Sequence, residues 1–236
     1  MRGFEVEYRP WQEGRTMALG PMKGLEFAHN AIVATTADIE QVVLAARTPE
    51  VATELRPRVQ FLARFIHGHV RGEEHAMYPP LAAKVPHIEK TFLVDHRDEE
   101  QVYADLEGLT SRCAEAGTAA SFDELRRRVS VLRAISDLHV KKENEIVLPL
   151  IGEHFDTQEQ AAMIGGILSV IPAADMPRFV PWITACQTPE LAVAYVGILA
   201  KNMPAPAFAA AKGWIRDGVP HERWALLVQR VPELAS

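Results

Sequence analysis

A five-residue pattern that occurs twice decides the fold of this chain. Residues 69–73 read HVRGE and are followed by Pro79, and residues 139–143 read HVKKE and are followed by Pro149. At an offset of 70 residues, the His, the Val, the basic residue in third place, the Glu and the Pro all coincide. Residues four apart share one face of a helix, with Cβ atoms about 5–6 Å apart, so each copy directs an imidazole and a carboxylate to one side.

One more histidine lies on the predicted helix before each copy. His29 stands 40 residues before His69, and His96 stands 43 residues before His139. The chain therefore predicts two helical hairpins, each with one His and then a His-x-x-x-Glu. Packing these hairpins about a pseudo-twofold axis brings four imidazoles and two carboxylates into one bundle interior. These candidate metal ligands are His29, His69, Glu73, His96, His139 and Glu143.

The first half of this region contains two predicted helices. Ala, Leu, Glu and Gln are frequent in residues 25–46, which predicts a first helix ending before Pro49. A second helix is predicted over residues 51–77. Its regular part should begin at or after Pro57, because proline has no backbone N–H to donate.

The second half has a matching pair. A third helix follows Pro86 and stops at Gly117. Ser121 and Glu124 have the spacing of a capping box, which predicts that a fourth helix opens there and runs to about Val147. Alternating β-branched runs are almost absent. We therefore predict an all-α fold, an antiparallel up-down four-helix bundle with short links.

The end of the chain differs in composition from the rest. We expect the chain to have three parts. Residues 1–20 form an N-terminal extension, residues 21–156 the bundle, and residues 157–236 a C-terminal appendage of short helices separated by prolines. This last part has six basic and six acidic residues, so the net charge of −6 belongs to the rest. Its apolar side chains need burial, and we expect it to close one end of the bundle, narrow access to it, or form a homodimer interface.

Composition excludes several other classes. The chain has 25 Lys and Arg against 31 Asp and Glu, so no basic surface predicts nucleic-acid binding. An apolar run long enough for a membrane span is absent, and the first residues lack the apolar core of a signal peptide. Two cysteines, Cys113 and Cys186, make no disulfide framework, and we expect a reducing, cytoplasmic location.

Convergent carboxylates and imidazoles imply bound cations. Desolvating an unpaired charge costs several kcal/mol, and a cation between the side chains removes this cost. Two shared carboxylates with terminal imidazoles suit a pair of iron ions, ahead of zinc or manganese. A structural zinc ion is satisfied by four ligands, so six convergent ligands imply two metal ions.

These residues resemble the motif of the hemerythrin-like, or HHE cation-binding, proteins. That motif has a His on the first helix, His-x-x-x-Glu on the second, His on the third and His-x-x-x-Glu on the fourth. The resemblance covers about residues 20–155. It includes Glu73-Glu74 before Tyr78-Pro79-Pro80-Leu81, and Pro149-Leu150 after the second motif. It implies a four-helix bundle in which Glu73 and Glu143 bridge two iron ions, joined by an oxo or hydroxo bridge, and the four histidines are terminal ligands.

One position departs from the oxygen-carrying members that this chain resembles. Those members have a second His one turn after the third-helix ligand, where this chain has Glu100. As a ligand, Glu100 would add negative charge and favour ferric iron, which points to redox reactivity or sensing instead of reversible O₂ carriage. The alternative is a solvent-facing Glu100 on the outer face of the helix.

Other residues have simpler interpretations. His67 and His75 lie off the ligand face and are expected to face solvent or to stand behind the ligands. Tyr103, two turns after His96, is either a phenol near the site or a core residue. Residues 179–183 (FVPWI) resemble a Pro-Trp segment that follows hemerythrin domains in plant iron-sensing ubiquitin ligases.

The sequence thus predicts a non-heme diiron protein that binds or reacts with O₂ or a related small oxidant, peroxide or nitric oxide. Catalase-like removal of peroxide would make it an enzyme, and stoichiometric reaction would not. Two alternatives stay open. One is an iron or oxygen sensor that signals through the C-terminal helices. The other is a diiron oxygenase or oxidase, which requires an apolar cavity for an organic substrate beside the metal ions.

Overall fold

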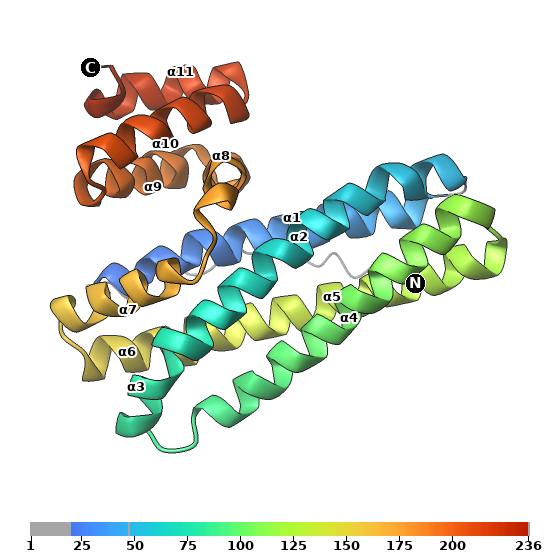
Figure 1. Cartoon of the computed structure of the whole chain (residues 1–236), viewed down its shortest axis with the longest axis horizontal. Helices are drawn as coiled ribbons and strands as arrows, with labels where there is room; N and C mark the ends of the chain where they lie inside the picture. Colours follow the sequence, from blue (N-terminus) through green and yellow to red (C-terminus); the bar gives the residue numbers. More distant parts are fainter. Residues whose placement is uncertain (1–19, 47, 236) are drawn as a thin grey trace, which may run out of the picture.

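The computed structural model describes residues 20–46 and 48–235, so most of the predicted N-terminal extension lies outside the described residues. Short 3₁₀ turns at Pro21–Gly24, Ala173–Asp175 and Pro232–Leu234 accompany the helices, and the described residues contain no strand. The helices (Figure 1) are α1 (Leu25–Ala45), α2 (Pro49–Ala76), α3 (Tyr78–Lys84), α4 (Glu89–Ala116), α5 (Ala119–Lys142), α6 (Leu148–His154), α7 (Thr157–Ser169), α8 (Met176–Cys186), α9 (Pro189–Asn202), α10 (Ala205–Gly218) and α11 (His221–Arg230).

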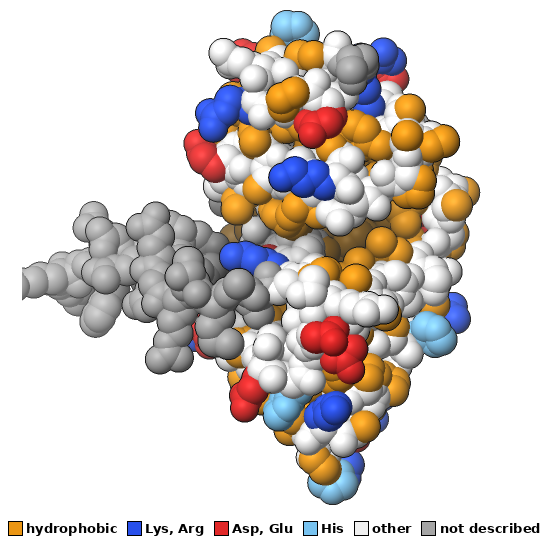
Figure 2. All heavy atoms as spheres, turned by 90° about the vertical axis from the view of Figure 1, so that its left-hand side faces the viewer, with side chains coloured by type: hydrophobic (Ala, Val, Ile, Leu, Met, Phe, Trp, Pro, Cys, Tyr) orange, Lys and Arg blue, Asp and Glu red, His pale blue; other side chains and the backbone are white. Residues whose placement is uncertain are grey.

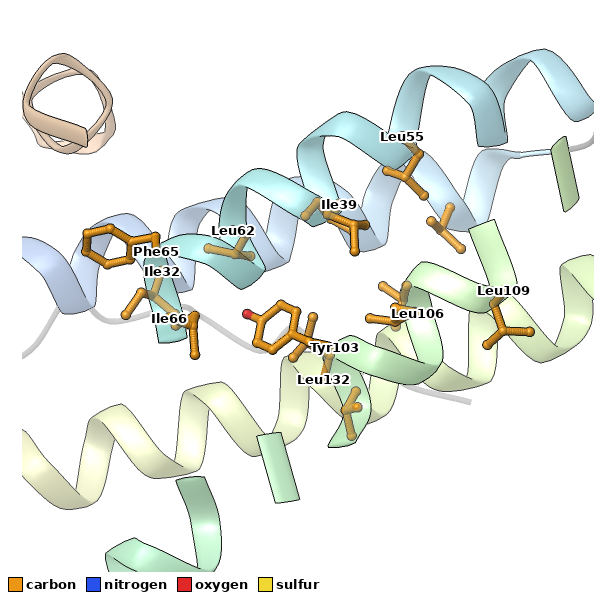
Figure 3. Packing of buried hydrophobic residues seen from close by; sticks show 14 of the residues in the cluster. Ile32, Ile39, Leu55, Leu62, Phe65, Ile66, Tyr103, Leu106, Leu109 and Leu132 are labelled. Atoms are coloured by element: carbon orange, nitrogen blue, oxygen red, sulfur yellow. The ribbon is translucent and has the colours of Figure 1, made fainter. Parts of the chain in front are cut away.

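Four long helices build the bundle. α1 packs on α2 and α5, and α4 packs on the same two helices, so the four close into a ring in chain order. Successive long helices run in opposite directions (Figure 1). Their interior is filled by branched aliphatic and aromatic side chains, and Figure 3 shows Ile32, Ile39, Leu62, Leu106 and Leu132 pointing into it. The predicted all-α helical bundle with additional C-terminal helices is confirmed.

The prediction that α2 becomes regular only at or after Pro57 is wrong. The helix begins at Pro49 and runs through Pro57 without a break. A proline inside a helix costs about 3 kcal/mol. Ala52, Leu55 and Val59, on either side of the proline, are each at most 1% exposed, so their burial against the bundle core offsets that cost.

The fourth long helix differs from its prediction at both ends. α5 is capped by Thr118, whose side chain accepts from the backbone N–H of Ser121, while the Ser121 hydroxyl accepts from the backbone N–H of Thr118. The capping box is therefore three residues earlier than predicted. At the other end, α5 gives way at Lys142 to a π-helical turn, Glu143–Val147, before α6. Such turns widen the helix by one residue and often lie at functional sites.

Close packing of small residues joins the C-terminal part to the bundle. α7 lies on α2, and α8 lies on α1. A Cβ atom at Gly72 of α2 would lie 2.7 Å from Cγ2 of Ile167, and one at Gly166 of α7 would lie 2.5 Å from Cβ of Ala76. Glycine at these two positions lets the two helix backbones approach closely.

Beyond α7, the chain leaves the bundle and forms a second group of helices (Figure 1). Helices α8 to α11 enclose their own apolar cluster, which includes Val180, Val196, Phe208, Ile215 and Leu227. On the face drawn in Figure 2, acidic and basic side chains are intermixed over both parts. Among the described residues, no single helix is long and apolar enough to span a membrane, although α7 and the segment Ala173–Cys186, bent by 84°, pass that test together.

Candidate metal centre

Six side chains from all four long helices meet inside the bundle near the α3 and α6 end. His29 comes from α1, His69 and Glu73 from α2, His96 from α4, His139 from α5, and Glu143 from the first position of the π-helical turn. Each of them is at most 4% exposed. The structure therefore brings together the six residues that the repeated pattern singled out.

These residues form two groups that share both carboxylates. His29 and His69 lie with Glu73 and Glu143 in one group, which we call the α1–α2 half; His96 lies with His139 and the same two glutamates in the other, the α4–α5 half. In each group the ligand atoms lie within 4.8 Å of one another. The arrangement has the approximate twofold symmetry that the sequence repeat implies.

The imidazoles present Nε2 to the carboxylates. The Nε2 atom of His69 lies 3.0 Å from Oε1 of Glu73, and that of His29 lies 3.1 Å from Oε2 of Glu143. In the α4–α5 half, His96 Nε2 lies 3.5 Å from Oε2 of Glu73. His139 Nε2 lies 3.5 Å from Oε2 of Glu143. Four nitrogen lone pairs and the carboxylate oxygens thus surround one small volume.

Seven of these inward-facing atoms are buried without a hydrogen-bond partner among the described residues. They are the four Nε2 atoms, both oxygens of Glu73 and Oε2 of Glu143. Buried polar atoms in folded proteins are nearly always hydrogen bonded, so seven exceptions in one place need an explanation. Bound cations supply one, because imidazole nitrogens and carboxylate oxygens are suitable ligands for iron and zinc. The donor set fits a pair of such ions.

Three of the four imidazoles are oriented by a partner on their other nitrogen. The Nδ1 atom donates to a side-chain oxygen, which leaves the Nε2 lone pair free to face inward. These pairs are His29 with Oδ1 of Asn144 (2.7 Å), His96 with Oε1 of Glu74 (3.0 Å) and His139 with Oδ2 of Asp95 (3.4 Å).

Tyr78 contacts the cluster, which the sequence did not predict. Its hydroxyl donates a short hydrogen bond to Oε1 of Glu143, and the residue is 2% exposed. Its ring packs on Phe92, with centroids 5.5 Å apart. The sequence indicated Tyr78 only as the end of a predicted helix and as part of a segment similar to the family. Helical spacing cannot predict where its side chain points beyond the break between α2 and α3.

When no cation is bound, the charges inside the cluster favour protons shared between the imidazoles and the carboxylates. Burial alone lowers the pKa of His29, but the carboxylates of Glu143 and Glu73 raise it to about 10. Burial and the charge of Glu143 raise the pKa of Glu73. His139 and His29 hold the pKa of Glu143 below its ordinary value despite burial. Burial and the neighbouring His29 lower the pKa of His69 to about 3.

Glu100 does not lie in the cluster. Its side chain is 49% exposed, and its Oε1 atom lies 3.1 Å from Nδ1 of the exposed His67 on α2. The preceding residue, Glu99, faces inward instead: it is 2% exposed and accepts a 2.6 Å hydrogen bond from Ser136. Burial raises the pKa of Glu99. The structure therefore supports the solvent-facing alternative for Glu100.

The periodicity of buried positions on α4 explains why Glu99, and not Glu100, faces the interior. Buried positions on α4 alternate in steps of four and three, through Phe92, His96, Glu99, Tyr103 and Leu106. The next buried position after His96 is therefore three residues later, at Glu99. After each histidine of the repeated pattern, the next cluster residue is four residues later. Tracing the apolar phase along residues 92–113 would have identified Glu99.

The remaining aromatic and histidine candidates are resolved by burial. Tyr103 is 4% exposed and belongs to the bundle core, where Figure 3 shows it in the interior with Ile66 and Leu106. It makes no hydrogen bond to the six cluster residues. His67 and His75 are exposed.

The α1–α2 half is covered by the C-terminal helices. Phe65 stacks on His69, with ring centroids 5.8 Å apart, and the ring of Trp182 lies 4.6 Å from that of Phe65. Beside His29, the Asn30 amide donates to Gln187 across 3.1 Å. α8 and the residue that follows it therefore pack directly behind this half.

Neither of the two best-formed cavities borders the cluster. One, of about 340 Å³, lies at the α4–α5 turn beside Phe122 and Arg126. The other, of about 300 Å³, lies among the C-terminal helices beside Met203 and Phe208.

Comparison with known proteins adds a family assignment. The model of the hemerythrin HHE cation binding domain matches residues 21–151. The zinc finger protein BRUTUS of Arabidopsis thaliana is 30% identical over 132 residues, 56% of this chain and 10% of that protein. A BRUTUS-like zinc finger protein of the same plant is 26% identical over 172 residues, 70% of this chain and 13% of that protein. The chain thus spans about a tenth of the length of these relatives. No solved structure matches.

Proposed function

Since this chain belongs to the family of hemerythrin HHE cation-binding domains, we propose that its six converging side chains hold two iron ions joined by an oxo or hydroxo bridge. The centre binds or reacts with O₂ or a related small oxidant, peroxide or nitric oxide. The observation that carries this proposal is the pair of ligand groups that share Glu73 and Glu143.

The protein side chains have separate tasks in this proposal. Glu73 and Glu143 hold the two ions close enough to act together, and the four imidazoles complete each half. Tyr78 fixes the orientation of Glu143 through its hydrogen bond. When bound, reduced iron supplies the electrons for reaction with a small oxidant. The surrounding apolar residues, including Phe65 and Phe92, limit the access of water.

Reaction is favoured over reversible carriage, but not for the reason that the sequence suggested. Glu100 lies outside the cluster and adds no charge to it. Glu74 instead places a carboxylate directly behind His96. Asp95 places one behind His139, although Lys142 offsets the charge of Asp95. Negative charge at this distance stabilises the more highly charged ferric ions, and ferrous iron is what a reversible O₂ carrier must preserve.

The experiment is to reconstitute the chain with Fe²⁺ without oxygen, admit O₂ or hydrogen peroxide, and follow the optical spectrum. An oxo-bridge charge-transfer spectrum that develops as the oxidant is consumed supports the proposal. Steady turnover of peroxide, far above that of free iron, would identify a catalyst, and reaction limited to one equivalent would identify a stoichiometric centre. An unchanged spectrum would contradict reactivity with either oxidant.

A second function, iron or oxygen sensing through the C-terminal helices, is favoured by one contact. Gly72 lies between His69 and Glu73 on α2, and it is packed against Ile167 of α7. The turn that carries His69 and Glu73 is therefore in direct contact with α7. If this chain is a sensor, removing the metal ions changes the protease sensitivity of residues 157–236. Identical digestion of loaded and metal-free protein would count against it.

The oxygenase alternative gains less support. An organic substrate needs an apolar cavity next to the metal ions. The two cavities described above lie at the α4–α5 turn and among the C-terminal helices. A small oxidant needs no such cavity, so it is the ligand class that we propose.

A further inference from the structure

We infer that the two halves of the centre are unequal and that the α4–α5 half, built on His96 and His139, binds its cation more tightly and fills first. This inference rests on the proposed function, because it concerns the two cations that the six residues hold. The coordinating atoms alone would predict equal halves, since each half has two imidazoles and shares the same two carboxylates.

The groups behind the imidazoles make the difference. In the α4–α5 half, His96 donates through Nδ1 to the Glu74 carboxylate and His139 donates to the Asp95 carboxylate. A carboxylate acceptor makes an imidazole a stronger ligand, and loss of such a partner typically costs 10–100-fold in metal affinity.

The α1–α2 half has neutral surroundings at the corresponding positions. His29 donates through Nδ1 to the amide oxygen of Asn144, which has no net charge. His69 stacks on the ring of Phe65. Among the described residues, neither imidazole of this half therefore donates through Nδ1 to a carboxylate behind it.

Net charge points the same way. Lys142 pairs with Asp95 and offsets its charge. Glu74 adds a further negative charge beside His96. The α4–α5 half consequently has more negative neighbours than the α1–α2 half, and a divalent cation is attracted to it more strongly.

Accessibility also differs between the halves. The side chains of Glu74 and Asp95 are 41% and 22% exposed, and each lies one hydrogen bond from a buried imidazole. On the other side, Trp182 and Gln187 cover the α1–α2 half. A cation that arrives from solvent therefore meets carboxylates at the α4–α5 edge first.

A titration of the metal-free full-length chain with Co²⁺ under argon tests the order of filling. We expect two binding steps of different affinity. His29→Ala should keep the tight step and lose the weak one, whereas His96→Ala should lose the tight step. Circular dichroism of each metal-free variant checks that its helix content is unchanged.

Two substitutions provide the matched comparison, because each changes the charge behind an imidazole with almost no change in side-chain volume. Asp95→Asn should weaken the tight step by about 10–100-fold and leave the weak step in place. Asn144→Asp should strengthen the weak step and bring the two affinities together, a gain that misfolding cannot produce.

Equal steps in the unmodified chain, or a tight step that survives His96→Ala and disappears in His29→Ala, would overturn the inference and leave the proposed centre standing. If the two affinities of Asn144→Asp differed as much as those of the unmodified chain, the inference would also be overturned. Failure of the chain to take up two cations at all would overturn both the inference and the proposed function.

Discussion

Each of the two glutamates of the centre is shared between its halves. Replacing a terminal histidine removes one ligand from one half, but replacing Glu73 or Glu143 removes a ligand from both. This sharing makes the carboxylates the positions where a single substitution has the widest effect on the proposed metal ions.

We predict that Glu73→Ala or Glu143→Ala impairs the binding of both iron ions. The matched control is Glu100→Ala, because Glu100 lies on α4 within one turn of a cluster residue but pairs with His67 on the surface. Elemental analysis after reconstitution is the measurement. Two fully occupied irons in either glutamate variant would remove the shared role, and loss of iron in the control would return Glu100 to the ligand set.

Tyr78→Phe removes the hydroxyl that donates to Glu143 and leaves a buried carboxylate oxygen without its donor. We expect the free energy of unfolding of the metal-free protein to fall by about 1–3 kcal/mol, the usual cost of an unsatisfied buried acceptor. Urea denaturation measures this. Tyr103→Phe is the control, since Tyr103 is equally buried but makes no hydrogen bond to the cluster. Equal losses in both variants would mean that Tyr78 contributes by packing alone.

The stability of the metal-free protein should depend on pH in one direction above neutrality. The folded-state pKa of His29 is raised from 6.5 to about 10. A raised pKa contributes stability that is fully present below pH 6.5 and is lost as the pH rises through about 10. His139, whose pKa is raised to about 9 mainly by Glu143, acts in the same direction against the effect of burial.

We therefore expect the thermal midpoint of the metal-free protein to fall between about pH 7 and pH 10. Cation affinity should rise over the same range, because a protonated imidazole must lose its proton before it coordinates. Differential scanning calorimetry and a Co²⁺ titration at several pH values measure the two trends. A midpoint that rises with pH would contradict the proton-sharing arrangement around His29.

The helices of the bundle could be predicted because the sequence patterns that indicate them occur twice. The two His-x-x-x-Glu copies, the proline after each and the single histidine before each indicate four helices with one polar interior. Elsewhere, burial outweighed the tendency of proline to interrupt a helix. α2 continues through Pro57 because the flanking apolar residues belong to the core. Local hydrogen bonding decided the start of α5, where Thr118 caps the helix ahead of Ser121.

The positions that sequence reasoning missed depend on geometry that spacing does not record. Tyr78 follows the break between α2 and α3, so its contact with Glu143 depends on the folded bundle. Glu99 faces the interior and Glu100 faces solvent because the next buried position after His96 on α4 is three residues later. The π-helical turn that begins at Glu143 has no marker in the residues that form it.

The contact between α2 and α7 gives a prediction at the same scale. A Cβ at Gly72 would lie 2.7 Å from Cγ2 of Ile167 and 3.0 Å from its backbone oxygen, so Gly72→Ala should destabilise the protein by about 1–3 kcal/mol through overpacking. Gly165→Ala in α7 is the control, because no atom lies within 4 Å of its Cβ position. There we expect a gain of up to about 1 kcal/mol from helix propensity.

Urea denaturation of the two glycine variants checks this pair. If Gly72→Ala were as stable as Gly165→Ala, the close packing of α7 on the ligand-bearing turn would not hold. The sensing function would then lose the contact on which it depends.

For the whole molecule, the structure joins a metal-binding bundle to a second apolar cluster formed by α8 to α11. The two parts meet at Phe65, Trp182 and Gln187, next to the α1–α2 half of the centre. The bundle belongs to the family of hemerythrin HHE cation-binding domains, and the six converging side chains lie within the matched residues 21–151. The C-terminal helices follow the part of the chain that the family model matches, and α8 packs behind the α1–α2 half of the centre.

The most direct test of the central claim is the iron content of the chain after anaerobic reconstitution and removal of loosely bound metal. The proposed centre predicts two iron ions for each chain, with an oxo-bridge charge-transfer spectrum once the protein is oxidised. One zinc ion for each chain, or no retained iron, would contradict it and would leave the buried imidazoles and carboxylates without the cations proposed here.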